Sequence, residues 1–259
     1  MLIIRPEQMK AFQKAALRNL SKEMVERAAE FAPFAHENIG RAGVARVVDI
    51  GIESAERHGL TEPGPVRAYI EIMFLLGTFF DSDPQYPWAP EILSAEQGPD
   101  QVLKADRLHA RTAEFMESAA GPDNSYLKTA LSFVGDMTSE DLPQTGSDIE
   151  EVYRMLTEIY PEKTESISRE AVEALVAHAK ELMDTYRIES PSGIPLFTLM
   201  MVLFGWGCFR DPRFPWIAES LSAQAQTDPA GGIEQLYSRT KAYTRHMLAF
   251  LAGNAVHGH

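Results

Sequence analysis

Asp83-Pro84-Gln85-Tyr86-Pro87-Trp88 returns later in the chain as Asp211-Pro212-Arg213-Phe214-Pro215-Trp216, at an offset of 128 residues (211 − 83). The same offset, without a gap, matches further residues along the chain: Pro33 with Pro161, Arg41 with Arg169, Pro63 with Pro191, Gly77 with Gly205, Leu93 with Leu221, Leu108 with Leu236, and Arg111-Thr112 with Arg239-Thr240. A match of this length indicates that the chain contains two copies of one unit. We expect the two copies to pack with pseudo-twofold symmetry.

Each copy has the pattern of helices separated by proline and glycine. One apolar stripe, in steps of three and four, runs from Met9 to Phe31 and stops before Pro33. Another runs from Val172 to Tyr186, with Ser168 as its expected N-cap. No sustained alternation of apolar and polar residues indicates a strand. The sequence therefore predicts an all-α fold.

One segment in each copy is apolar on nearly every side, over residues 65–80 and 194–209. Such a helix has to be surrounded by others, so we expect it at the centre of its copy. Gly77 and Gly205 lie near its end, where they indicate close helix contact or a C-terminal turn. A last long helix is expected over residues 100–119 and 232–252.

These elements divide the chain into three regions. Residues 1–125 form the first helical repeat with its long N-terminal helix, and residues 149–259 form the second. Residues 126–148 connect them, with a short helix capped by Asp123 or Asn124 and then an exposed linker from about Thr138 to Ser147.

Composition limits the classes of function. The chain of 259 residues carries 24 Lys and Arg against 37 Asp and Glu, a net charge of −13, so it repels phosphate backbones and nucleic acid is not an expected partner. The apolar segment of residues 194–209 carries no charge, but its 16 residues are fewer than the roughly 20 of a membrane span. The one cysteine, Cys208, lies in that run, and we expect a reducing, cytoplasmic location.

No motif for catalysis or for metal binding stands out. His36-Glu37 and the pair His178 and Glu181 are the nearest candidates, and neither has the His-Glu-x-x-His spacing of a zinc site. Gly-x-Ser-x-Gly is missing as well. We therefore expect no catalytic residue, no metal and no cofactor.

The duplicated aromatic turn is the strongest motif, and a structural role is favoured for it. Two prolines restrict each turn, and the aspartate can accept hydrogen bonds from its amides. Asp83 and Arg111 recur as Asp211 and Arg239. We predict that each aspartate pairs with the arginine of its own copy, or that both support the same turn, which clamps the tryptophan against the core. The residues of this turn and clamp are Asp83, Pro84, Tyr86, Pro87, Trp88, Arg111, Asp211, Pro212, Phe214, Pro215, Trp216 and Arg239.

The opening segment from Met1 to Phe12 and the segment from Gly64 to Trp88, above all Asp81-Ser-Asp-Pro-Gln-Tyr-Pro-Trp88, resemble a family of uncharacterised bacterial proteins. These are encoded beside spike-tip (PAAR-type) toxins of type VI secretion systems. The resemblance covers mainly the first copy and brings no catalytic residues. It implies a partner role beside a secreted effector.

The sequence thus favours a non-enzymatic interaction protein, an accessory adaptor or chaperone of such an effector. A cognate immunity protein, whose acidic surface would cover a basic toxin, is the alternative within the same class. An enzyme or small-molecule binder with a cleft between the repeats is the alternative of another class.

Overall fold

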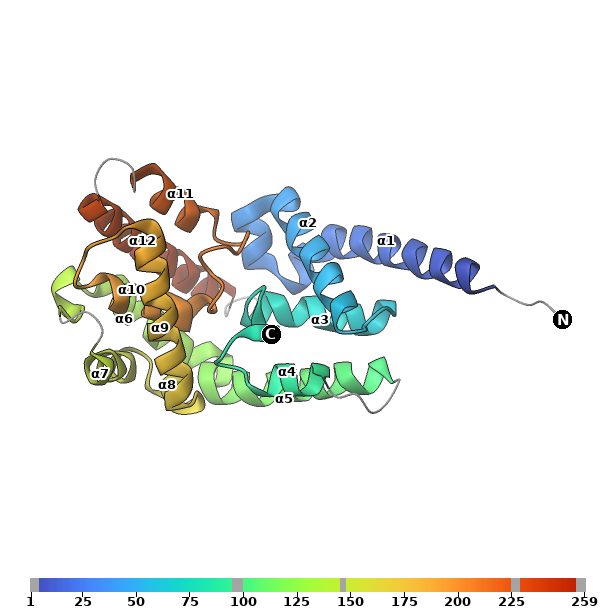
Figure 1. Ribbon diagram of the computed structural model, residues 1–259, viewed down its shortest axis with the longest axis horizontal. Helices are drawn as coiled ribbons and strands as arrows, with labels where there is room; N and C mark the ends of the chain where they lie inside the picture. The colour runs from blue at the N-terminus through green and yellow to red at the C-terminus, as the bar shows by residue number, and fades with distance from the viewer. Residues whose placement is uncertain (1–4, 95–99, 145–147, 225–228, 255–259) are drawn as a thin grey trace. The chain divides into compact units, whose positions relative to one another are not determined.

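The computed structural model describes residues 5–94, 100–144, 148–224 and 229–254, and all of the regular structure in these ranges is helical (Figure 1). The all-α prediction is confirmed. The chain divides into two compact units, the first formed by residues 1–82 and 87–112, and the second by residues 83–86 and 113–259. Residues 83–86 of the first aromatic turn and residues 113–148 belong with the second unit, and the expected regions 1–125, 126–148 and 149–259 stay a prediction.

Unit 1 is built from α1 (Pro6–Phe31), α2 (Pro33–Arg57), α3 (Pro63–Leu76), the 3₁₀ turn η1 (Phe80–Ser82), α4 (Trp88–Ser94) and the first part of α5 (Gln101–Ala120). α1 ends where the sequence predicts, because Pro33 starts the next helix. α2 packs on both α1 and α3. At Gly51 the backbones come so close that an added Cβ would lie 2.6 Å from Ile70.

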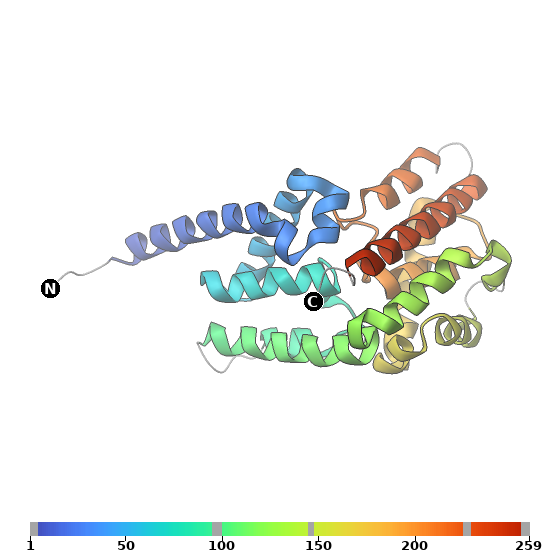
Figure 2. The same ribbon diagram turned by 180° about the vertical axis from the view of Figure 1, so that it is seen from behind.

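The described part of unit 2 contains the rest of α5 and seven further helices, with 3₁₀ turns η2 (Pro122–Asn124) and η3 (Ser139–Asp141). The helices are α6 (Ser125–Asp136), α7 (Ile149–Ile159), α8 (Pro161–Ser166), α9 (Arg169–Tyr186), α10 (Gly193–Phe204), α11 (Pro215–Gln224) and α12 (Pro229–Asn254). α12 packs along α6, and α10 packs on α9. Figure 2 shows α6 and α12 from the side on which both are unobstructed.

The apolar segment of the second copy forms the centre of unit 2, as expected. Ten of the twelve residues of α10 are buried, so nearly all of its surface faces other helices. Each large apolar side chain that is fully buried there contributes about 1.5–3 kcal/mol to folding. α3 is less enclosed, because Leu75 keeps 57% of its surface exposed.

Both apolar helices end earlier than the sequence indicates, and they end at the matched glycines. Gly77 follows α3 with φ 129° and ψ 145°, and Gly205 follows α10 with φ 92° and ψ 149°. The amide of each still bonds to the helix, Gly77 to the carbonyl of Met73 at 3.0 Å and Gly205 to that of Met201 at 2.9 Å. Side chains disfavour this backbone region, so the recurring glycine marks a C-terminal turn.

The caps of two other helices were also expected from the sequence. The hydroxyl of Ser168 accepts a hydrogen bond from the amide of Ala171 at 3.1 Å and caps α9. Asn124 takes the N-cap position of α6 with a left-handed backbone, but its side chain forms no capping bond. The segment expected to be a linker contains η3, in which Asp141 binds the amide of Thr138 at 2.5 Å; residues 145–147 lie outside the described residues.

We predict that Gly77→Ala and Gly205→Ala each lower the free energy of unfolding by about 1–3 kcal/mol, because alanine strains the backbone at these φ and ψ values. The measurement is urea denaturation followed by circular dichroism. Gly64→Ala is the matched control, since Gly64 lies in the first turn of α3 with nothing within 4 Å of an added Cβ. Equal stability of all three variants would contradict the assignment of the two glycines.

Candidate functional site

The two aromatic turns share the same local geometry. In each turn the aspartate carboxylate accepts a hydrogen bond from the amide two residues on, at 2.9 Å for Asp83 and at 2.9 Å for Asp211. The aromatic residue then donates its amide to the aspartate carbonyl, at 2.9 Å from Tyr86 and 3.0 Å from Phe214. The pattern of buried and exposed residues through the turns is also the same. The turns therefore fold alike.

The carboxylate of Asp83 is buried in unit 2 and bound on several sides. Besides the amide of Gln85 it accepts the amide of Trp206 at 2.8 Å, and the side-chain amide of Gln85 lies 3.1 Å from Oδ2. Gln85 also donates to the carbonyl of Met201 at 3.0 Å. Burial raises the pKa of Asp83 to about 6, although these hydrogen bonds and the nearby Lys163 act in the opposite direction.

Lys163, at the start of α8, brings a second ionisable group into this core. Its ammonium group donates to the carbonyl of Val202 and lies 5.9 Å from the centre of the Phe115 ring. Burial lowers the pKa of Lys163 to about 8, and the carboxylate of Asp83 opposes that shift. Nothing in the sequence around Lys163 indicates a buried charge, so the sequence did not reveal this residue.

The second turn contains a buried ion pair between Arg213 and Asp211. At the same place the first turn has a contact between Asp83 and the uncharged side chain of Gln85. Arg213 donates from Nη2 and Nε to Oδ2 of Asp211 at 2.8 and 3.0 Å. Gln85 and Arg213 occupy the same position of the two turns, and both direct nitrogen donors at the aspartate. Both copies have a polar residue with N–H donors at this position. This match is the sequence feature that could have indicated the contact with the aspartate.

In the second copy the contacts agree with the second alternative of the predicted clamp, in which Asp211 and Arg239 both support the same turn. The arginine that the structure places on Asp211 is Arg213, because it lies two residues along the same turn. Arg239 binds the carbonyl of Trp216 at 3.0 Å and Glu219 at 3.2 Å, and so supports the end of the turn. The pairing of Asp83 with Arg111 stays a prediction.

Trp216 packs its ring against other aromatic rings. Its centroid lies 5.5 Å from that of Tyr243 and 6.3 Å from that of Phe204. Its indole N–H is buried without a hydrogen-bond partner among the described residues. Ring packing, rather than a hydrogen bond from the indole, thus holds this side chain.

A polar cluster of unit 1 exists in one copy only. Asp81 accepts hydrogen bonds from His58 and from the hydroxyl of Tyr69, each at 2.8 Å. Burial raises the pKa of Asp81, but these two hydrogen bonds hold it below its ordinary value. At the matched positions of the second copy, Phe197 and Phe209 pack with ring centroids 4.5 Å apart. The cluster joins α2, α3 and η1, which is a structural role.

The histidines named from the sequence show no metal site. His178 lies 3.2 Å from Glu181 and packs its ring 4.6 Å from that of Trp206. Within the described part of the chain, no group of three or more acidic, histidine or cysteine side chains could hold a metal ion. In the same ranges, no helix combines the length and the apolar character that a bilayer span requires.

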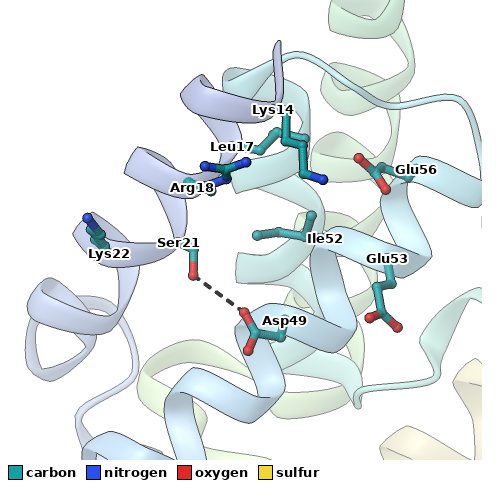
Figure 3. Close-up of a pocket in the computed structure, with 9 residues that line it drawn as sticks. All are labelled: Lys14, Leu17, Arg18, Ser21, Lys22, Asp49, Ile52, Glu53 and Glu56. Carbon is teal, nitrogen blue, oxygen red and sulfur yellow. Dashed lines mark hydrogen bonds between the residues drawn. The ribbon is translucent and has the colours of Figure 1, made fainter. Parts of the chain in front are cut away.

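An open groove of about 490 Å³ lies between α1 and α2 (Figure 3). Its floor contains the apolar side chains Leu17 and Ile52. One wall carries the cationic residues of α1, and the other carries the acidic residues of α2: Lys14, Arg18 and Lys22 against Asp49, Glu53 and Glu56. Ser21 bridges the helices by donating to Asp49 at 3.5 Å.

Of these features, the turns and the Asp83 network are enclosed, and the groove is open. The enclosed polar groups form hydrogen bonds with one another and with backbone atoms of unit 2, so these groups do not face a partner. The groove offers apolar and charged atoms to the solvent side. It is therefore the candidate site for a partner.

We predict that Asp83→Asn removes a pH dependence of stability. Because the folded pKa is raised to about 6, the stability from this carboxyl is fully present below its unfolded pKa of about 4 and is lost as the pH rises through about 6. In the natural protein this contribution falls by about 3 kcal/mol between pH 4 and pH 7. Urea denaturation at both pH values measures it. Asp106→Asn, at an exposed position, is the control and should keep the natural pH dependence.

Lys163→Met should act at the opposite end of the pH range. The folded pKa of Lys163 is lowered to about 8, so its contribution is present above the unfolded pKa and is lost as the pH falls through about 8. The variant should therefore lose the gain in stability that the natural protein shows between pH 7 and pH 10. An unchanged alkaline gain would mean that Lys163 is not the group responsible.

No protein-family model matches this chain, and no characterised protein and no solved structure matches it either. The function has to be argued from the residues of the chain itself. They provide an enclosed polar core in unit 2 and an open, charged groove in unit 1.

Proposed function

We propose that the chain is a non-enzymatic accessory protein, an adaptor or chaperone that binds a secreted effector of a type VI secretion system. The resemblance of the first copy to proteins encoded beside spike-tip toxins suggests the partner. An unpartnered apolar stripe on α1 supports the mode of action.

This stripe is the observation that carries the proposal. In the first turns of α1 every side chain that the structure describes, from Glu7 to Ala15, is exposed. Met9 and Phe12 keep 48% and 63% of their surface in contact with solvent. They continue the line of Leu20 and Met24, which are buried in the later turns of the same helix.

The register of the helices explains why the stripe is uncovered, because α2 runs antiparallel to α1 and ends at Arg57, before it reaches the first turns of α1. α1 has 26 residues and α3 has 14, lengths of about 39 and 21 Å. The ion pair between Arg67 and Glu23, at 2.7 Å, places the start of α3 beside the middle of α1. The N-terminal turns of α1 thus extend beyond the helices that cover the rest of it (Figures 1 and 2). A partner that covers Met9 and Phe12 gains about 25 cal/mol per Å² of apolar surface buried.

A cognate immunity protein is the second candidate, and the net charge of −13 favours it. A basic toxin would be attracted by this charge over distances up to the Debye length, about 10 Å at 0.1 M salt. An adaptor that grips an apolar effector segment would depend less on salt.

We also propose that the two sequence copies arose from one helical unit and are related by pseudo-twofold symmetry. The gapless offset of 128 residues and the like geometry of the turns at Asp83 and Asp211 support this. The proposed symmetry relates the folds of the two copies and not their binding surfaces, because the exposed apolar stripe of α1 belongs to the first copy alone.

We predict that Met9→Ser with Phe12→Ser reduces co-purification of the effector encoded beside this gene at least about tenfold, because the stripe loses apolar contact area. Stability should not change, since both side chains are exposed. Glu7→Gln with Ala11→Ser, at exposed positions on the opposite side of the same helix, is the matched control. Co-purification that is equal for both double variants would overturn the role of the stripe.

The salt dependence of that binding separates the two candidate functions. An adaptor that binds through apolar contacts should keep its affinity within about threefold between low salt and 0.5 M salt. An affinity that falls by orders of magnitude would favour a charge-matched immunity protein. Titration calorimetry at several salt concentrations measures it.

A further inference from the structure

The groove between α1 and α2 keeps its positive and negative charges apart. Lys14, Arg18 and Lys22 follow one another along one face of α1, at the spacing of successive helical turns. Figure 3 shows them across from the carboxylates of α2. No ion pair joins the two walls among these fully described residues, so carboxylate and nitrogen atoms across the groove are more than 4.0 Å apart.

The register of the two helices explains how the charges are opposed. Ser21 contacts Asp49, and Arg41 contacts Glu26, so α1 and α2 run antiparallel. This register places Lys14 near the level of Glu56 and Lys22 near that of Asp49. Each wall is therefore about 12 Å long, or about two helical turns.

We propose that this groove binds an amphipathic helix of the protein partner, with its apolar face on Leu17 and Ile52, an acidic flank along α1 and a basic flank along α2. The proposal rests on the partner role proposed above and adds the chemistry of the bound segment. Charge complementarity is the argument, because a helix with two oppositely charged flanks completes both rows of charges at once.

A second copy of this chain does not fit the groove. Among the residues that the structure describes, the start of α1 is the helix end that extends beyond its neighbours with an exposed apolar face, and its charged residues between Pro6 and Arg18 are Glu7 against Lys10, Lys14 and Arg18. It could face the acidic wall of α2 but would place like charges against the wall of α1. A different protein is therefore the occupant.

The charges of the two walls also attract each other across the groove. If this attraction were their only effect, the charged residues would have a structural role alone. Reversing one wall loses the attraction, whereas exchanging the charges of the two walls restores it. Only a bound helix senses which wall carries which sign. The two roles can therefore be separated by experiment.

The probes are three synthetic helical peptides that share one leucine stripe. In the first, one flank carries glutamates and the other carries lysines; in the second and third, both flanks carry glutamates or both carry lysines. Fluorescence anisotropy with the full-length protein measures their affinities. We expect the split-flank peptide to bind at least about tenfold more tightly than either of the others.

Reversal of one wall should change which peptide binds best. Lys14→Glu with Arg18→Glu makes both walls acidic and should favour the lysine-flanked peptide. Glu53→Lys with Glu56→Lys makes both walls basic and should favour the glutamate-flanked one. A lysine-flanked peptide attracted only by the overall charge of −13 would bind all forms of the protein similarly.

The four substitutions together reverse the net charge of each wall, from +3 to −1 along α1 and from −3 to +1 along α2, because Lys22 and Asp49 keep their charges. The split-flank peptide should then bind as tightly as to the natural protein, but in the opposite direction along the groove, because turning a helix end for end exchanges its flanks. A photo-crosslinker at the peptide N-terminus, mapped by mass spectrometry, should move from one end of the groove to the other. Thermal stability should be close to that of the natural protein.

Two results would overturn the proposal: equal affinities of the three peptides for the natural protein, or a crosslink that stays at the same end after the exchange. Concentration-dependent dimerisation that the wall variants abolish would assign the groove to a second copy and would also overturn it. Loss of effector binding by the Met9 and Phe12 variant alone bears on the proposed function, whereas the peptide experiments bear on the groove.

Discussion

The carboxylate of Asp83 is buried in the core of unit 2, where backbone and side-chain amides, rather than water, donate hydrogen bonds to it. Trp206 and Gln85 supply amide donors, and the ammonium group of Lys163 lies close enough to influence its charge. A carboxylate that lost these donors would be strongly destabilising, because an unpaired charge in a protein interior has no compensating solvent. The loop after α10, the first aromatic turn and the start of α8 are therefore fixed relative to one another within unit 2.

The two copies keep the turn and change what surrounds it. Like Asp83, Asp211 is a buried carboxylate that needs hydrogen-bond donors. Its donor is the guanidinium group of Arg213, at the position where the first copy has the side-chain amide of Gln85. The polar contact of Tyr69 with Asp81 gives way to the aromatic contact of Phe197 with Phe209. Positions that fix the backbone are thus retained, whereas positions that only fill the core differ between polar and aromatic solutions.

The proposed partner sites are surface features of unit 1 that take no part in its core. The first turns of α1 lie beyond the end of the antiparallel helix α2, so Met9 and Phe12 are exposed. The pairing of α1 with α2 leaves a groove whose two walls differ in sign of charge. Both features are surfaces where we propose that a partner binds, and both involve α1, whose counterpart α7 has only 11 residues.

The sequence by itself determined the all-α class, the helix end before Pro33, the cap at Ser168 and the special role of Gly77 and Gly205, because proline, capping hydroxyls and glycine act on the backbone within a few residues. It also pointed to the aspartates of the turns as acceptors. Only the tertiary structure decided that Arg213 is the arginine placed on Asp211, that Lys163 is buried beside Asp83, and that Lys14 and Glu56 stand on opposite walls of one groove. The last two arrangements depend on the packing and register of segments far apart in the chain, which local sequence patterns do not encode, whereas Arg213 reaches Asp211 within one turn.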